Sequence, residues 1–259
     1  VFHALTLTGT ALPTDKTYAN QKRAAEILNR VLPEAPEHPG IAHYVIHSFD
    51  YPELAQLALP AARTYAKLAP GSPHALHMPS HIFTRLGLWD ESIASNLASA
   101  EKARAYVAAR KGPQVTSFEE LHAVDYLVYA YLQEGRYQEA KRLLDALTGV
   151  SQLDTPNFAA AYALAAVPAR YALERRAWPE AAALRPLRFD WDKMPYAEAN
   201  VHFARALGAA RSGDLETARD ALARVTLIRL ALIEQKNAYW ADQVEIQRRG
   251  AEAWLRLAE

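Results

Sequence analysis

Gly135-Arg136-Tyr137-Gln138-Glu139-Ala140 has a glycine, an aromatic residue two positions later and a small residue at its end, and this pattern recurs along the chain. Each related stretch lies between two apolar segments with helical spacing. The small residues that end the four stretches stand at positions 92, 140, 181 and 218, so neighbouring stretches are 48, 41 and 37 residues apart. The other three stretches are Gly87–Ser92, Arg176–Ala181, in which arginine replaces the glycine, and Gly213–Ala218, in which leucine replaces the aromatic residue.

The repeat and the composition both predict an all-α protein. Self-similarity at a period of about 34 to 47 residues, with two helices per unit, is typical of an α-solenoid of antiparallel helix pairs. Hydrophobic residues make up 51% of the 259 residues, leucine and alanine dominate, and only 10 residues are glycine. Such a composition favours helices over sheets.

This arrangement resembles the tetratricopeptide repeat (TPR) family, whose unit carries a glycine, an aromatic residue and a small residue in the same turn. The resemblance covers roughly residues 36–230 and implies a single TPR-like helical repeat domain over residues 1–259. The implied units are roughly residues 1–35, 36–70, 71–112, 113–155, 156–193 and 194–230, followed by a capping helix over residues 231–258.

Five of the nine histidines lie between positions 43 and 81, in two short stretches. His43 and His47 are four residues apart and His77 and His81 repeat this spacing, so each pair would share one face of a helix. His74 lies one turn before His77. Because neutral imidazole is a good ligand for several transition metals, two such helices packed together could supply most of a coordination sphere.

The stretches His38–His47 and His74–Phe83 resemble a histidine-rich group of mostly uncharacterised bacterial TPR-like proteins, which are longer and often exported. This resemblance implies that further repeats could precede Val1. It also favours a periplasmic or secreted location, and the absence of cysteine is compatible with such a location. A cytoplasmic location is the alternative.

In the TPR family the first helix of each unit lines a concave groove, and the repeat frame assigns most of the histidines to groove-facing positions. The resemblance therefore implies a metal site in that groove. The predicted principal ligands are His43, His47, His77 and His81. The predicted additional ligands, or groups that hold a ligand through a hydrogen bond, are His74, His122, Asp50 and Asp125. The predicted lining of the substrate groove is Tyr44, Tyr129, Arg85 and Arg170.

Ligation by imidazole without thiolate suits zinc or copper, and an added carboxylate would also admit iron or manganese. We therefore predict a metal-dependent enzyme, hydrolytic or oxidative, that acts on a small molecule or peptide in the groove. Two alternatives stay open. One is a TPR adaptor that binds a peptide or protein partner in the groove without metal, and the other is a protein that stores or delivers metal. The sequence does not identify the reaction, the catalytic residues or the oligomeric state.

Several other functions are disfavoured by the residues of the chain. Lys plus Arg equals Asp plus Glu, at 29 each, and no basic block occurs, which argues against binding to nucleic acid or to a membrane surface. No apolar run is long enough to span a bilayer. The chain has no cysteine, no HExxH motif and no strand–turn–helix elbow around a serine, so thiolate chemistry, typical zinc proteases and serine hydrolases are disfavoured.

Three local predictions concern the helices near the histidines. Thr14 and Asp15 are predicted to cap a helix over residues 16–32. A further helix is predicted over residues 40–49. Pro79 is predicted to remove one backbone hydrogen bond and to kink the helix that carries His77 and His81.

Overall fold

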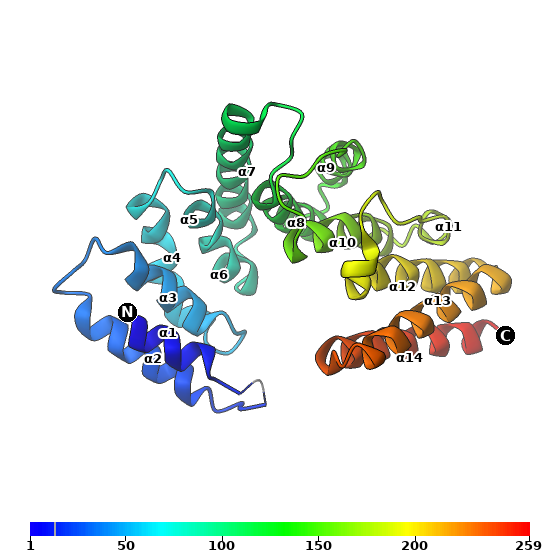
Figure 1. The fold of residues 1–259 in the computed structure, drawn as a ribbon, viewed down its shortest axis with the longest axis horizontal. Coiled ribbons are helices and arrows are strands. Elements are labelled where there is room, and N and C mark those ends of the chain that lie inside the picture. Colours follow the sequence, from blue (N-terminus) through cyan, green and yellow to red (C-terminus); the bar gives the residue numbers. More distant parts are fainter. Residues whose placement is uncertain (13) are drawn as a thin grey trace. The chain divides into compact units, whose positions relative to one another are not determined.

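The computed structural model describes residues 1–12 and 14–259, which form an all-helical protein (Figure 1). Within these two ranges no strand occurs, and extended pairing is confined to an isolated bridge between Thr116 and Leu153. The helices pack mainly against their neighbours in sequence. The predicted all-α class is therefore confirmed.

The chain divides into two compact units, Val1–Arg110 (unit 1) and Lys111–Glu259 (unit 2). Unit 1 contains α1 (Phe2–Gly9), α2 (Ala19–Val31), α3 (Pro39–Phe49), α4 (Ala55–Leu68), α5 (Pro73–His77), α6 (Pro79–Arg85) and most of α7 (Trp89–Lys111). Unit 2 contains α8 (Phe118–Gln133), α9 (Tyr137–Thr148), α10 (Phe158–Glu174), α11 (Trp178–Ala182), the 3₁₀ turn η1 (Trp191–Lys193), α12 (Pro195–Ser212), α13 (Leu215–Glu234) and α14 (Ala238–Ala258).

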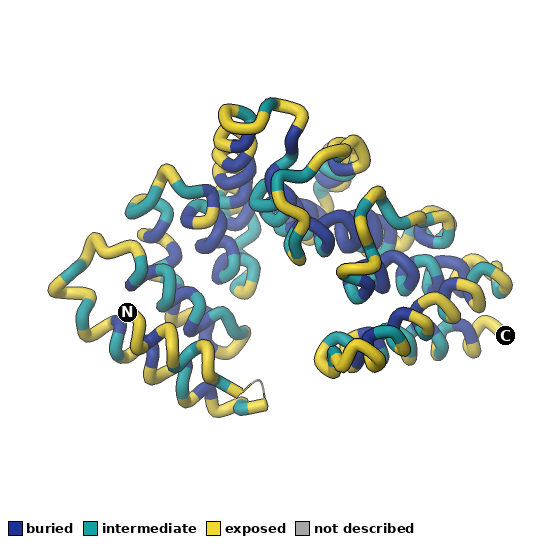
Figure 2. Tube along the Cα trace, in the orientation of Figure 1, coloured by how far each residue is buried: buried dark blue, intermediate teal, exposed yellow. Residues whose placement is uncertain are grey.

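Each helix buries one side against its neighbours, so buried and exposed residues alternate along the chain trace (Figure 2). In unit 1, α3 packs on both α2 and α4, and α4 in turn packs on α5 and α6. Ile41, Ile46 and Ile82 are among the fully buried side chains of this core. Burying these side chains contributes roughly 1.5–3 kcal/mol each, which holds the histidine-bearing helices in place.

The four predicted turn stretches share one backbone geometry. The first residue of each has a positive φ, and the next amide donates to the carbonyl oxygen five residues earlier at 2.8–3.0 Å, which is a Schellman closure of the preceding helix. Glycine takes this conformation without steric cost, whereas Arg176 takes it with a side chain. The four φ angles are 69° at Gly87, 69° at Gly135, 54° at Arg176 and 80° at Gly213.

A fifth turn of the same kind joins α13 to α14. Lys236 has a φ of 57°, and the Asn237 amide donates to the Leu232 carbonyl oxygen at 2.9 Å. This turn lacks the glycine of the sequence pattern. The helix–turn–helix link is therefore more regular in structure than in sequence.

The predicted capping by Thr14 and Asp15 is wrong, because the helix begins at Ala19 rather than near residue 16. The Asp15 carboxylate accepts hydrogen bonds from the Thr17 amide at 2.8 Å and the Thr17 hydroxyl at 2.6 Å, so it closes a local turn instead. Tyr18 precedes α2 in the left-handed conformation, with a φ of 56°. The helix predicted over residues 40–49 is confirmed as α3.

Among the described residues, no helix combines the length and the apolar character needed to cross a membrane.

Candidate metal centre

Three helices of unit 1 present the five clustered histidines. α3 carries His43 and His47, α5 carries His74 and His77, and α6 carries His81. Capping fixes where the first two helices start. The His38 ring nitrogen Nδ1 accepts from the Gly40 amide at 3.1 Å at the start of α3, and the Ser72 hydroxyl accepts from the Ala75 amide at the start of α5.

Met78 separates α5 from α6 with helical φ and ψ angles of −52° and −37°, so Pro79 coincides with a break in the hydrogen-bond ladder between two short helices. Proline lacks the amide hydrogen that would continue the hydrogen-bond ladder, and α5 ends at His77. His77 and His81 therefore lie on either side of the break. They face each other nevertheless, with their ring centroids 4.9 Å apart.

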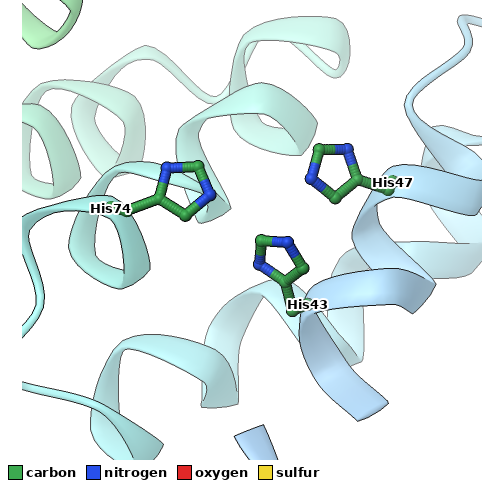
Figure 3. Close-up of side chains that lie close together, drawn as sticks. All are labelled: His43, His47 and His74. Atoms are coloured by element: carbon green, nitrogen blue, oxygen red, sulfur yellow. The ribbon is translucent and has the colours of Figure 1, made fainter. Parts of the chain in front are cut away.

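His43, His47 and His74 form a triad in which one nitrogen from each ring lies within 4.8 Å of those of the other two. His43 and His47 project from α3, while His74 approaches from α5, and the three rings point into one common space (Figure 3). The His43 ring centroid lies 4.6 Å from that of His47 and 5.2 Å from that of His74. His43 and His47 are partly buried, whereas His74 is exposed. A metal ion from solution can therefore reach the triad at His74.

The triad is held in its neutral form. Burial lowers the pKa of His43 to about 4, with further contributions from the charges of His47, His74 and His81. Burial also lowers the pKa of His47 to about 4, and the charges of His81 and His74 add to this effect. The pKa of His74 is also lowered, because neighbouring protein atoms displace part of the water around the ring of this otherwise exposed residue, and the charge of His81 adds to this effect. Neutral imidazole is the form that binds metal, so these rings are ready ligands at neutral pH.

His77 and His81 form a second arrangement in unit 1, a pair in which the two Nε2 atoms are 3.0 Å apart. Each ring has an oxygen partner on its other nitrogen. His77 Nδ1 lies 2.6 Å from Asn96 Oδ1, and His81 Nδ1 lies 2.8 Å from Asp50 Oδ2. His77 is 2% exposed and Asn96 is fully buried, so this chain of contacts is largely shielded from water.

These partners determine where the protons of the pair lie. The Asn96 amide nitrogen donates to the Ser92 carbonyl oxygen at 2.8 Å, which turns Oδ1 toward His77. A carboxylate or amide oxygen can only accept, so both Nδ1 atoms carry a proton and donate it. In neutral rings both Nε2 lone pairs would then converge at 3.0 Å. A cation between the two nitrogens, either a proton or a metal ion, removes this repulsion.

Asp50 links the pair to a cation at the surface. Its Oδ1 atom accepts from Arg85 Nε at 2.9 Å, while Oδ2 accepts from His81. Burial raises the pKa of Asp50, but the hydrogen bonds and charges of His81 and Arg85 outweigh burial and bring the pKa below its usual value. Asp50 is therefore an ionised acceptor for His81 at neutral pH. Carboxylates in this position orient a metal-binding imidazole and increase its basicity.

Tyr44 and Tyr65 flank His43. The Tyr65 hydroxyl lies 3.1 Å from His43 Nδ1, and burial raises the pKa of this phenol, so it stays protonated. Tyr44 packs edge-on against His43, with ring centroids 4.8 Å apart. If Nδ1–H of His43 donates to the Tyr65 hydroxyl oxygen, Nε2 carries the lone pair and is the atom that binds metal.

The other four predicted site residues belong to unit 2. His122 and Asp125 lie on α8, and the His122 ring packs against Tyr126 with centroids 5.5 Å apart. Asp125 is buried and forms an ion pair with Arg170, whose guanidinium also lies 5.2 Å from the centre of the Tyr129 ring. Within unit 2, Asp125 is thus paired with a cation, and Arg170 already has an anionic partner.

Sequence reasoning missed two residues that hold the histidines, Tyr65 and Asn96. A signal for Asn96 exists in α7, whose buried face includes the polar residues Ser92, Asn96 and Ser99 beside the apolar Ile93, Ala100, Ala103 and Val107. Ser99 on this face donates to the Pro73 carbonyl oxygen at 2.8 Å, next to the hydrogen bond of Asn96 with His77. Buried asparagine needs partners for its amide group, so its presence on a packed helix face predicts a neighbouring polar side chain.

No protein-family model and no curated protein matches this chain. The arrangement of the histidines is therefore the main guide to its function.

Proposed function

We propose that this protein binds a transition metal ion through His43, His47 and His74 and uses the ion in a hydrolytic or oxidative reaction. The observation that carries the proposal is the triad, in which two helices bring three neutral imidazoles together within 4.8 Å. Three protein ligands would leave at least one coordination position for water or a substrate, as in catalytic rather than structural zinc sites.

The distances within the triad are close to those of a loaded site. With metal–nitrogen bonds of about 2.0–2.1 Å, neighbouring nitrogens in a tetrahedral site are about 3.3–3.4 Å apart. The upper limit of 4.8 Å in the triad therefore requires the rings to close by about 1.5 Å or less. Rotation of the exposed His74 side chain can provide this movement without a shift of the backbone.

The His77–His81 pair supports the same proposal by a separate argument. Two imidazole nitrogens bound to one ion at right angles are about 2.9 Å apart, which matches the 3.0 Å separation of the two Nε2 atoms. The pair can therefore hold a second ion, or His81 can complete the sphere of the first. All-imidazole ligation favours zinc or copper, and participation of Asp50 would also admit iron or manganese.

For the fold we propose a TPR-like α-solenoid, closed by α14. The support is the repeated Schellman turn, which joins α6 to α7, α8 to α9, α10 to α11, α12 to α13 and α13 to α14 with the same backbone geometry. In a TPR-like arrangement the histidine-bearing helices α3, α5 and α6 would face the groove. The substrate would then be a small molecule or peptide bound there.

Metal content measured by mass spectrometry on tag-free protein tests the proposal. We expect the parent protein to contain at least one zinc or copper ion per chain. Removing a residue that only hydrogen-bonds to a metal ligand lowers metal affinity about 10–100-fold. Removing a ligand itself should cost more, so His47→Ala and His74→Ala should each weaken metal binding by more than about 100-fold. His3→Ala is the matched control, because His3 is an exposed histidine outside the cluster.

Two results would overturn the metal proposal. One is a parent protein that contains no metal and gains no thermal stability from added zinc or copper. The other is a parent whose metal content is equally reduced by His3→Ala and by the triad variants. Either result would leave the alternative in which the protein is a TPR adaptor that binds a peptide without metal.

A further inference from the structure

A cavity of about 410 Å³ lies beside the triad in unit 1. His47 and Asp50 form part of its wall, so the cavity reaches both a proposed metal ligand and the carboxylate that holds His81. Its remaining lining residues are Leu5, Thr8, Gly9, Tyr44 and Tyr51. A cavity of about 150 Å³ is enough to hold benzene, so this one has room for a substituted aromatic ring or a molecule of two rings.

The chemistry of the wall restricts what the cavity can hold. Tyr44 and Tyr51 supply aromatic rings, and Leu5 supplies an aliphatic surface. The Thr8 hydroxyl donates to the Ala4 carbonyl oxygen at 3.0 Å, so toward a ligand it acts as an acceptor. None of the seven residues in this wall is a lysine or arginine, and Asp50 is already paired with His81 and Arg85. Phosphorylated or multiply anionic molecules would find no positive side chain in the wall.

The phenols of the wall are fixed in position by neighbouring residues. The Tyr51 hydroxyl lies 3.2 Å from Gln21 Nε2, and its ring packs against Tyr18 with centroids 4.8 Å apart. Tyr44 is held by its edge-on contact with His43. A preformed wall of this kind lowers the entropy cost of binding a rigid planar molecule.

From these features we propose that the cavity binds a small phenolic or catecholic molecule, whose ring packs against Tyr44 and Tyr51 and whose hydroxyl oxygen binds the metal at the triad. This inference rests on the proposed metal site and names its substrate class. The metal would replace a positive side chain as the partner of the phenolate oxygen. A second ring hydroxyl could donate to Thr8.

The test uses 4-nitrocatechol, whose visible spectrum changes when its oxygens bind a metal ion. The metal-loaded protein is titrated with this probe, and the metal content of each sample is measured alongside. The chain has no cysteine, so thiolate absorption cannot contribute to the spectrum. We expect saturable binding of one probe molecule per triad in the parent protein.

Two variants in α1 fill the cavity without touching the histidines. Gly9→Phe adds a ring where the wall is open, because a Cβ atom at Gly9 would meet no heavy atom within 4 Å. Leu5→Trp enlarges a second wall residue. Gly71→Phe is the matched control, since Gly71 also has open space within 4 Å but lies in the loop before α5, outside the cavity wall. We expect the two filling variants to weaken probe binding at least tenfold at unchanged metal content, and the control to leave it unchanged.

Failure of this inference can be distinguished from failure of the metal proposal. If the protein retains its metal but both filling variants bind the probe as tightly as the parent does, the cavity is not the binding place and the inference is overturned. The inference is also overturned if the metal-loaded parent does not bind the probe. A parent that contains no metal removes the metal proposal and this inference together.

Discussion

Acidification is expected to destabilise the metal-free protein through His43 and His47. Both imidazoles have a pKa of about 4 in the folded protein, against 6.5 in an unfolded chain. Between these pH values the unfolded chain binds protons that the folded protein does not. The free energy of unfolding therefore rises with pH in this window, and it falls as the pH is lowered from about 6.5 toward 4.

The size of the effect follows from the number of protons. Each imidazole contributes up to about 1.4 kcal/mol per pH unit where only the unfolded chain is protonated. Both rings are partly exposed, and solvent screening narrows the window over which this slope applies. We therefore expect His43 and His47 together to account for a loss of about 3 kcal/mol between pH 7 and pH 4.5, roughly three-fifths of the unscreened value of about 5 kcal/mol.

Urea denaturation of metal-free protein at a series of pH values measures this slope. The comparison is with a His43→Gln/His47→Gln double variant, in which polar side chains replace the rings but do not titrate. Carboxylates such as Asp50 also lose stabilising interactions in acid, but they do so in both proteins. The difference in slope between parent and variant isolates the two histidines. Equal slopes between pH 4.5 and pH 6.5 would refute the assignment of buried neutral imidazoles.

Two further predictions concern the packing of α12 and the orientation of the His77–His81 pair. Gly208→Ala should destabilise the protein by about 1–3 kcal/mol in thermal or urea unfolding, because the added methyl group would lie 2.5–2.7 Å from atoms of the neighbouring helix α11. At Gly250 the nearest atom would be 3.4 Å away, so Gly250→Ala should be neutral or stabilising by up to about 1 kcal/mol. Equal effects of the two substitutions would contradict this packing. Asn96→Leu should cost about 1–3 kcal/mol and lower the metal affinity of the His77–His81 site about 10–100-fold, because it leaves the buried Nδ1 proton of His77 without this acceptor. Ser99→Ala should reduce stability but preserve the metal affinity of this site.

The sequence predicted the helix–turn–helix links where the turn chemistry is local. A glycine followed by an aromatic residue marks Gly87 and Gly135, and each takes the left-handed conformation that this pattern requires. Lys236 takes the same conformation without any of these residues. Its turn is stabilised by backbone hydrogen bonds and by the packing of α13 on α14, which sequence spacing does not reveal. Local patterns therefore locate most of these turns but miss one fixed by tertiary contacts.

The spacing of the histidines predicted pairs but not their partners. An i, i+4 spacing places His43 and His47 on one face of a single helix, and the structure shows this arrangement in α3. Which residue of α5 approaches them depends on how α3 and α5 pack, and this brings in His74 rather than His77. His77 and His81, also four residues apart, lie next to each other in the same way, with their Nε2 atoms 3.0 Å apart. The structure thus divides the four principal ligands predicted by spacing between two groups, His43 and His47 beside His74, and His77 beside His81.

The hydrogen bonds of the His77–His81 pair argue for a cation-binding role more strongly than the clustering itself does. In a histidine pair that served packing alone, one ring would carry a proton on Nε2 and donate it to Nε2 of the other ring. Here the Asn96 and Asp50 side-chain oxygens lie 2.6 Å and 2.8 Å from the Nδ1 atoms of His77 and His81 and fix a proton on each. Both Nε2 lone pairs are therefore directed to the same point. The Asn96 amide is itself held by the Ser92 carbonyl oxygen, so the arrangement depends on a few polar residues among the otherwise apolar buried positions of α7. With both protons on Nδ1, a cation between the two rings would remove the repulsion between the Nε2 lone pairs, which is the role proposed for this pair.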